Sequence, residues 1–125
     1  MKDLTRIDFS NNGLADVSSI KDLTRLTRLN LSNNRIKNFS VFATEDAFPQ
    51  LQWLDISNNK FTEWPGFKCP KLDYLNIGGN KLEKVNEGWT GHPTLRIISA
   101  KDNKFKNLNN FKNCPKLEEL YLASN

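Results

Sequence analysis

The sequence predicts an α/β fold of the solenoid type, a right-handed coil of about six repeats bent into a horseshoe arc. A parallel sheet would line its concave face, with short turns and 3-10 pieces on its convex face. A nine-residue pattern, L-x-x-L-x-L-x-x-N with apolar substitutes, occurs six times in 125 residues. Its last residues recur at intervals of 22, 25, 21, 23 and 22, which is typical of stacked repeats. These asparagines are Asn12, Asn34, Asn59, Asn80, Asn103 and Asn125.

Each copy of the pattern predicts one short strand. In Leu54-Asp55-Ile56 a polar residue stands between two apolar ones, which is the period of a half-buried strand. Copies stacked about 4.8 Å apart would pair into a continuous parallel sheet. The asparagine after each strand both donates and accepts hydrogen bonds, so stacked asparagines would form a ladder that satisfies the turn backbone.

The segments between the copies supply the rest of the core. Apolar residues recur two, five and about eight positions after the asparagine, as Leu82, Val85 and Trp89 do after Asn80. These segments are too short for long helices, which favours turns and 3-10 pieces. The second repeat is longer. We expect its residues 43–47 to form one or two turns of α-helix with Ser40 or Thr44 as the N-cap.

The whole chain resembles leucine-rich-repeat proteins. Segments Cys69–Leu72 and Cys114–Leu117, both C-P-K-L, precede strands as in the short 22-residue class found in intracellular phosphatase regulators, nuclear scaffolds and axonemal proteins. The resemblance implies a binding module and names no partner, because a fold does not carry a function. We expect residues 1–125 to be a single domain of a longer protein. A neighbouring domain or chain would then cover the open core beside Leu4 and Leu122.

Composition and the search for a leader sequence bear on the cellular compartment of the protein. The chain is 38% hydrophobic and 26% charged, which is near average usage for soluble domains. A run of 18 apolar residues and an N-terminal apolar segment are both absent from the sequence, which predicts neither a membrane span nor a retained signal peptide. We therefore predict an intracellular protein, cytoplasmic, cytoskeletal or nuclear. Secretion is the alternative, because a removed signal leaves no trace and Asn30 and Asn38 begin formal glycosylation sequons.

Two cysteines and the single histidine occupy one column before the strands. Cys69 and Cys114 are two repeats apart, hence about 10 Å, beyond the roughly 7 Å limit for a disulfide. A metal ladder of Cys69, His92 and Cys114 is one interpretation, because thiolate and imidazole bind zinc. Three ligands are too few for a closed structural site, which favours a buried column. We expect free, buried thiols, no metal and no cofactor.

A catalytic interpretation fails on geometry. His92 precedes a strand, whereas Ser10 and Ser57 follow strands, so a Ser-His-Asp arrangement does not form. Gly78-Gly79 lacks the helix and lysine of a phosphate loop and predicts a tight turn. We expect no enzymatic activity.

Outward-facing strand positions predict the binding site for a protein partner. On the concave face one column holds arginines followed by Trp53, Tyr74 and Ile97. Contiguous exposed aromatics mark interaction sites, and tryptophan, tyrosine and arginine dominate hot spots. The alternatives are scattered aromatics without function and cover by another segment. The predicted contact residues are Arg6, Arg28, Trp53, Asp55, Tyr74, Asn76, Ile97 and Tyr121.

Net charge provides a second hypothesis. The chain carries +4 at pH 7, and basic residues follow four of the ladder asparagines, namely Arg35, Lys60, Lys81 and Lys104. This basic edge would suit an anionic partner such as RNA, acidic protein or headgroups. Glu63 and Glu83 are interspersed, which favours an ordinary solvated edge instead. Aromatic residues do not interleave with the basic ones, which weakens the RNA version.

Overall fold

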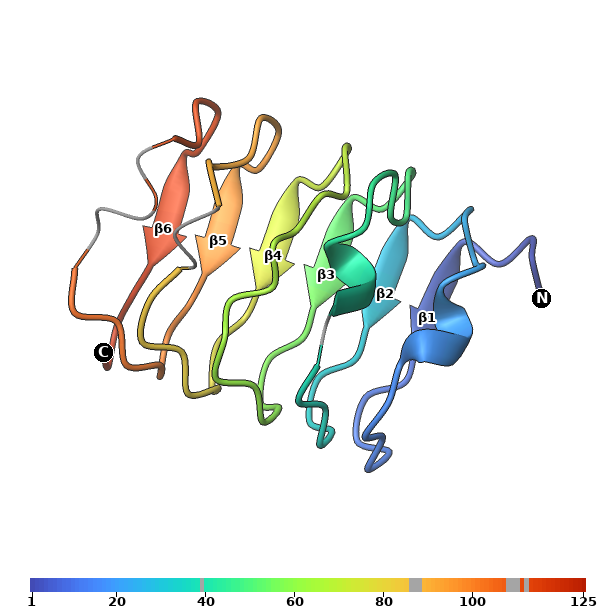
Figure 1. Cartoon of the computed structure of the whole chain (residues 1–125), viewed down its shortest axis with the longest axis horizontal. Helices are drawn as coiled ribbons and strands as arrows, with labels where there is room; N and C mark the ends of the chain where they lie inside the picture. The colour runs from blue at the N-terminus through green and yellow to red at the C-terminus, as the bar shows by residue number, and fades with distance from the viewer. Residues whose placement is uncertain (39, 86–88, 108–110, 112) are drawn as a thin grey trace.

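The chain forms a coil of stacked repeats with six parallel strands along one side (Figure 1). The computed structural model describes residues 1–38, 40–85, 89–107, 111 and 113–125. The strands are β1 (Arg6–Asp8), β2 (Arg28–Asn30), β3 (Trp53–Asp55), β4 (Tyr74–Asn76), β5 (Ile97–Ser99) and β6 (Glu119–Tyr121). They pair in sequence order, each with the equivalent residues of the next repeat. The predicted solenoid is confirmed.

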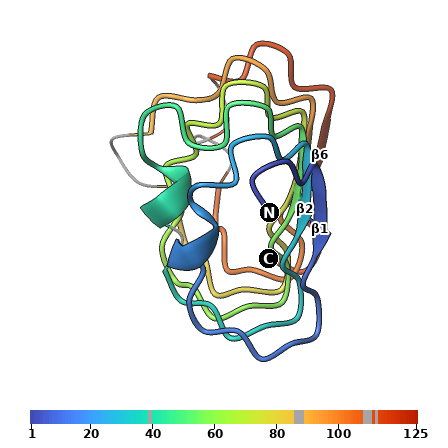
Figure 2. The ribbon, with the colours of Figure 1, turned by 90° about the vertical axis from the view of Figure 1, so that its right-hand side faces the viewer.

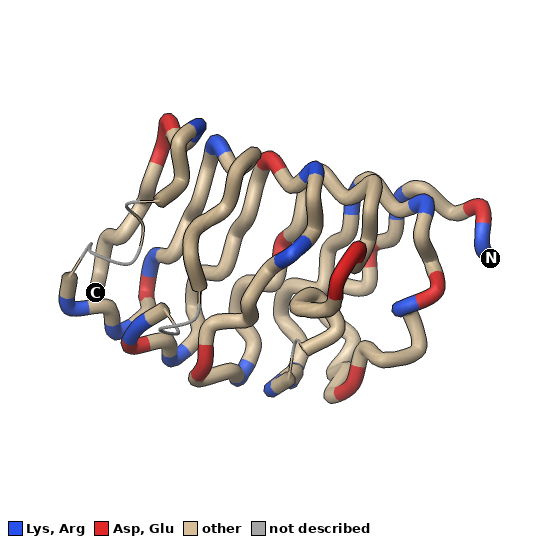
Figure 3. Tube along the Cα trace, turned by 45° about the horizontal axis from the view of Figure 1, so that its top comes forward, with Lys and Arg blue, Asp and Glu red and all other residues tan. Residues whose placement is uncertain are grey.

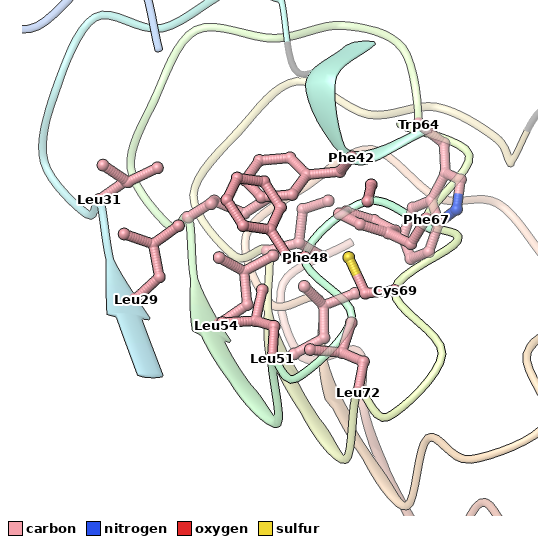
Figure 4. Close-up of a cluster of buried hydrophobic side chains, with 14 of the residues drawn as sticks. Leu29, Leu31, Phe42, Phe48, Leu51, Leu54, Trp64, Phe67, Cys69 and Leu72 are labelled. Carbon is pink, nitrogen blue, oxygen red and sulfur yellow. The ribbon is translucent and has the colours of Figure 1, made fainter. Parts of the chain in front are cut away.

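The core lies between the sheet and the return segments (Figures 2 and 4). The middle residue of each interior strand points inward, and Leu29, Leu54, Leu75 and Ile98 are fully buried. From the other side, the Phe42 ring packs on Phe48, with centroids 5.2 Å apart. Of the predicted column residues, Leu14 and Trp89 are half-buried, and Phe39 and Leu108 lie outside the described residues. The others are buried, namely Val17, Ile20, Ile36, Phe42, Phe61, Trp64, Phe67, Leu82, Val85, Phe105 and Phe111.

The asparagine ladder is also confirmed. Asn59 shows one rung: its Nδ2 donates to the carbonyls of Leu31 at 3.0 Å, Ile56 at 3.1 Å and Ser57 at 3.1 Å. Its Oδ1 accepts from the Ile36 N–H at 3.1 Å. One side chain thus satisfies turn groups in two consecutive repeats. The same arrangement recurs at Asn34, Asn80, Asn103 and Asn125.

The α-helix predicted for residues 43–47 is wrong. Short 3-10 turns η1 (Ser18–Ile20) and η2 (Ser40–Phe42) lie opposite the sheet, and residues 43–50 are turns and bends. Asp46 and Phe48 have φ of 56° and 46°, a left-handed conformation that a right-handed helix excludes. The side chain of Asn38 accepts the Ser40 N–H at 2.7 Å, and the Thr44 hydroxyl donates to the Val41 carbonyl at 3.3 Å, instead of accepting an N–H as an N-cap does.

Within the described residues, no helix is both long enough and apolar enough to cross a bilayer. Apart from η1, η2 and Phe111, which also has 3-10 conformation, the described parts of the return segments have irregular backbone. The strands and their outward side chains are therefore the most regular surface of the molecule.

Candidate functional site

The outer face of the sheet carries the predicted contact residues. We call it the open sheet face and define it by the outward-pointing residues of β1 to β6. Strand register places Arg28, Trp53, Tyr74 and Ile97 next to one another in that order. Arg28 is exposed and the other three are half-buried. Arg6 precedes Arg28 in the same register, so the structure brings five of the eight predicted residues into one row.

Three of these side chains, Arg28, Trp53 and Tyr74, are stacked. The Arg28 guanidinium carbon lies 4.0 Å from the Trp53 ring centroid, which is cation–π geometry. On the next strand Tyr74 stacks on Trp53, with ring centroids 5.2 Å apart and planes 6° from parallel. Since the two neighbours stack on the Trp53 ring, the row offers mainly ring edges to a partner.

Tyr74 is held as a neutral phenol beside two polar residues of the same face. Burial raises its pKa, and the negative charge of Asp55 raises it further, while a hydrogen bond with Asn76 acts in the opposite direction. Asp55 and Asn76 also shape the turns that follow their strands. Asp55 Oδ1 accepts the N–H and hydroxyl of Ser57 at 2.9 and 2.6 Å, and Asn76 Oδ1 accepts the Gly78 N–H at 3.1 Å.

The other predicted contact residues lie at the two ends of the sheet. Arg6 is exposed on β1 and pairs in register with Arg28. Tyr121 is on β6, 40% exposed, and its hydroxyl donates to Glu119 Oε1 at 2.6 Å. That hydrogen bond raises the Tyr121 pKa. The Lys101 ammonium lies 5.1 Å from the Tyr121 ring centroid. Tyr121 therefore belongs to a second group of side chains, two strands away from Tyr74.

Sequence reasoning missed an ionic row along the edge where the strands begin. Arg96 donates to both carboxylate oxygens of Asp73 at 2.7 and 2.9 Å, and to Glu118 at 2.8 Å. Bidentate pairing of this kind fixes the orientation of the guanidinium, and the two carboxylates raise the Arg96 pKa. The three residues occupy equivalent positions just before β4, β5 and β6. Their alternating charge was the signal that could have revealed the row.

The basic edge forms a stacked column in the structure. Backbone N–H groups of its residues donate to carbonyls of the preceding repeat, for example Lys60 to Ile36 at 2.9 Å and Lys104 to Leu82 at 2.7 Å. The side chains of Arg35, Lys60, Lys81 and Lys104 are exposed. Acidic positions are interspersed with basic ones along the solenoid (Figure 3). The field of this edge is consequently mixed rather than uniformly positive.

The cysteine and histidine column is buried. Cys69 and Cys114 are free thiols, as predicted. His92 Nδ1 accepts the Thr94 N–H at 3.2 Å, so its Nε2–H donates to the Cys69 carbonyl at 2.9 Å. Burial lowers the pKa of His92 and raises that of Cys69 to about 12. Among the described residues, no cluster of three His, Cys, Asp or Glu could hold a metal ion.

Comparison with known proteins shows matches along most of the chain. Tsukushi of Gallus gallus is 32% identical over 95% of this chain and 34% of its own length. Leucine-rich repeat-containing protein 23 of Homo sapiens is 32% identical over 77% of this chain and 26% of its own length. An internalin C2 structure from Listeria monocytogenes superposes with a TM-score of 0.84 at 26% identity, covering 97% of this chain and 52% of that one. The chain thus spans about a third or less of these two curated relatives.

The predicted intracellular localisation is wrong. Lumican of Bos taurus is 29% identical to this chain. Like Tsukushi and the internalins, it is a secreted or extracellular protein. Our prediction depended on the absence of an N-terminal apolar segment. A cleaved leader leaves no trace in the remaining sequence, and the repeat pattern records burial rather than compartment.

Two repeat profiles match the sequence. "Leucine Rich repeats (2 copies)" covers residues 2–44, and "Leucine rich repeat" covers residues 24–82. The finer assignment to the class of the phosphatase regulators is not confirmed by these matches and stays a prediction. The six-fold pattern, the asparagine ladder, the parallel sheet and the profile matches agree: this chain belongs to the leucine-rich-repeat family.

Proposed function

We propose that this chain is a non-enzymatic module that binds a protein partner on its open sheet face, centred on Trp53. Leucine-rich-repeat proteins typically bind proteins and are typically not enzymes. The observation that carries the proposal is the Arg28–Trp53–Tyr74 stack. Figure 2 shows this side of the sheet facing outward, with no other described segment across it.

The stack supports the proposal because it is already ordered. Freezing a large side chain on binding costs about 0.5 to 1.5 kcal/mol, and a side chain held by its neighbours avoids much of that cost. Arginine, tryptophan and tyrosine are also the residue types that dominate binding energy at interfaces. Ile97 extends the row with an apolar surface beside Tyr74, and Arg6 extends it with a second cation beside Arg28.

The remaining predicted residues take supporting roles in this proposal. Asp55 and Asn76 hold the turns below the stack and keep the strand ends fixed. Tyr121 contributes a second aromatic contact near the end of the sheet. The proposed interface therefore crosses all six strands and is strongest at β2 to β4.

The substitution Trp53→Ala tests the proposal. It should weaken binding of a purified partner by about 2 kcal/mol or more, roughly 30-fold, in calorimetric titration. The melting temperature should change little, because the Trp53 side chain is only half-buried. Gln52→Ala, an exposed neighbour, is the matched control.

Fluorescence quenching by acrylamide gives a test that needs no partner. Trp64 is buried and Trp89 half-buried on the opposite side of the core, so the difference between wild type and Trp53→Ala isolates the Trp53 signal. We expect Trp53 to be accessible to the quencher. A shielded Trp53 in the free protein, or normal partner binding by Trp53→Ala, would contradict the proposal.

The basic edge supports one alternative, a binder of anionic partners. Four exposed basic residues stack along it, and phosphate contacts would make the affinity fall steeply with salt. The paired substitution Lys60→Ala and Lys81→Ala separates the hypotheses. It should leave a partner of the open sheet face unaffected and should weaken an anionic ligand.

A further inference from the structure

The fourth repeat lacks two side chains that the first three repeats carry. After β1, β2 and β3 come Ser-Asn pairs, whereas Gly78-Gly79 follows β4. The serine hydroxyls of repeats one to three donate to the strand-end side chain at 2.6 to 2.7 Å, to Asp8, Asn30 and Asp55 respectively. At Asn76 only the Gly78 N–H makes the equivalent bond. The open sheet face is therefore recessed at Gly78-Gly79 relative to the Ser-Asn pairs of the first three repeats.

A hollow of about 390 Å³ lies beside Gly78 and Gly79. It opens on the open sheet face at the ends of β3 to β6, immediately beside the stacked row. Its apolar lining comes from the rings of Tyr74 and Tyr121 and from the aliphatic side chain of Ile97. Its polar lining includes Ser57 and Asn76, and its cation is Lys101.

The two glycines beside the hollow differ in what surrounds them. Gly79 has φ of +63°, and Asn58 Oδ1 occupies the place where its Cβ would be. Gly78 has no positive φ, and an added Cβ would lie 3.0 Å from the Lys101 carbonyl oxygen and 3.3 Å from Asn76 Oδ1. A serine at position 78 would therefore occupy space beside the hollow only if the Lys101 backbone and the Asn76 side chain moved by a few tenths of an ångström. It would also restore the hydroxyl bond seen in the first three repeats.

The charges around the hollow indicate its ligand. Within the described part of the chain, Lys101 makes no salt bridge, unlike Arg96 on the same repeat. Asp55, the nearest strand-end carboxylate, already accepts two hydrogen bonds from Ser57. An incoming carboxylate would pair with Lys101 without displacing an existing ion pair. Asp102 also lines the hollow, so an incoming carboxylate is favoured only where it contacts the Lys101 ammonium and stays away from the Asp102 carboxylate.

We infer that this hollow receives a single aspartate or glutamate side chain of a protein partner, paired with Lys101 and packed against Tyr74, Ile97 and Tyr121. The inference rests on the proposed function, because the acidic side chain would come from the same partner that covers the stack. The hollow would make the open sheet face more selective, because a partner would need one acidic residue about two strands away from its contact with Trp53.

The test uses peptides selected from a random phage-displayed library on the whole 125-residue chain, together with N-acetyl-glutamate methylamide as a small probe. We expect selected peptides to share one acidic residue. Replacing it with its amide, or introducing Lys101→Met, should weaken peptide binding by about tenfold, and the two changes together should cost little more than either alone. In nuclear magnetic resonance spectra, the small probe should shift the amide signals of Gly78, Gly79 and Lys101.

Gly78→Ser is the sharpest variant, because it places beside the hollow a residue that three other repeats carry at this position. It should reduce peptide affinity by about tenfold. Its melting temperature is measured beside that of Lys101→Met, because the added Cβ makes a tight contact with the Lys101 backbone. Gly66→Ser, in the return segment after β3, is the matched control. Its added Cβ would meet only Ala43 Cβ at 3.9 Å.

The outcomes separate this inference from the proposed function. Peptides that lose affinity with Trp53→Ala and bind Gly78→Ser and Lys101→Met like wild type would overturn the inference and leave the proposed function standing. Peptides sensitive to the hollow variants but not to Trp53→Ala would support the acidic site and contradict the Trp53-centred function. Failure of the small probe to shift the three amides, with no acidic residue shared among selected peptides, would also overturn the inference.

Discussion

The first and third repeats carry the same nine-residue pattern, yet they bury it to different extents. In the third repeat Leu51, Leu54 and Ile56 are fully buried, whereas Leu4 and Phe9 of the first are each 39% exposed. The third repeat lies between β2 and β4, while β1 pairs only with β2 in the described chain. Burial in this solenoid is therefore supplied by adjacent repeats and not by the repeat itself.

The ladder asparagines show the same contrast. Asn59 is 5% exposed and its Nδ2 donates to three carbonyls. Asn12 is exposed, and in the described residues its Nδ2 donates only to the Ser10 carbonyl, at 3.0 Å. Cover of this open end by a neighbouring domain or chain stays a prediction.

Truncation of large core side chains should give the largest difference between the two repeats. Trp64→Ala, in the return segment of the third repeat, should lower the free energy of unfolding by about 3 to 5 kcal/mol, because Trp64 is 1% exposed and packs edge-on against Phe67 at 5.5 Å. Phe9→Ala should cost about 1 kcal/mol, since water already reaches that ring. Urea denaturation measures both. Equal losses would contradict the dependence of burial on neighbours.

Removal of one rung of the ladder should have an intermediate effect. Asn59→Ala leaves the buried Ile36 N–H without its acceptor, which should cost about 1 to 3 kcal/mol. The three carbonyls that accept from Asn59 lose one donor and keep another, from Asn34, Asn80 and the Asn33 N–H respectively. For Asn12→Ala we expect about 0.5 kcal/mol, because its groups are solvated. Thermal melts of the two variants compare them directly. A larger loss at Asn12 would show that the first rung is buried in solution.

Cysteine labelling should detect the smallest difference, which is between local opening around Cys69, after β3, and around Cys114, after β5. Labelling compares the two sites without any change in stability. Burial raises the pKa of Cys69 to about 12, so very little of this thiol is ionised at pH 8, and thiolate is the reactive form. Cys114 is 7% exposed, and burial raises its pKa too. We expect slow labelling of both thiols in the native protein, with Cys114 reacting first, and rapid labelling after denaturation. A Cys69–Cys114 disulfide in nonreducing mass spectrometry would contradict the repeat register.

The strands could be predicted from the sequence because their pattern records burial directly. In a strand, Leu54 and Ile56 point to one side and the polar residue between them points to the other, so only one arrangement buries both apolar side chains. A register slip of one residue would expose both of them. The helix at residues 43–47 failed for the opposite reason. Left-handed φ at Asp46 and Phe48 prevents a helix in this segment, and the sequence gives no sign that a phenylalanine will adopt that conformation.

The candidate site was predictable only in part. Register alone placed Trp53, Tyr74 and Ile97 side by side, but the position of the Arg28 guanidinium over the indole depends on side-chain rotamers. The hollow at Gly78-Gly79 was also missed. We interpreted this pair as a turn, and the effect of two absent side chains appears only when the neighbouring repeats are stacked beside it.

The asparagine ladder has a consequence for how the chain opens. Each rung from Asn34 onward joins its repeat to the preceding one and to no other. Detaching the first repeat breaks one rung, whereas freeing a middle repeat breaks two. We therefore expect local unfolding of this chain to proceed from its outer repeats inward, with backbone amide exchange slowest at β3 and β4.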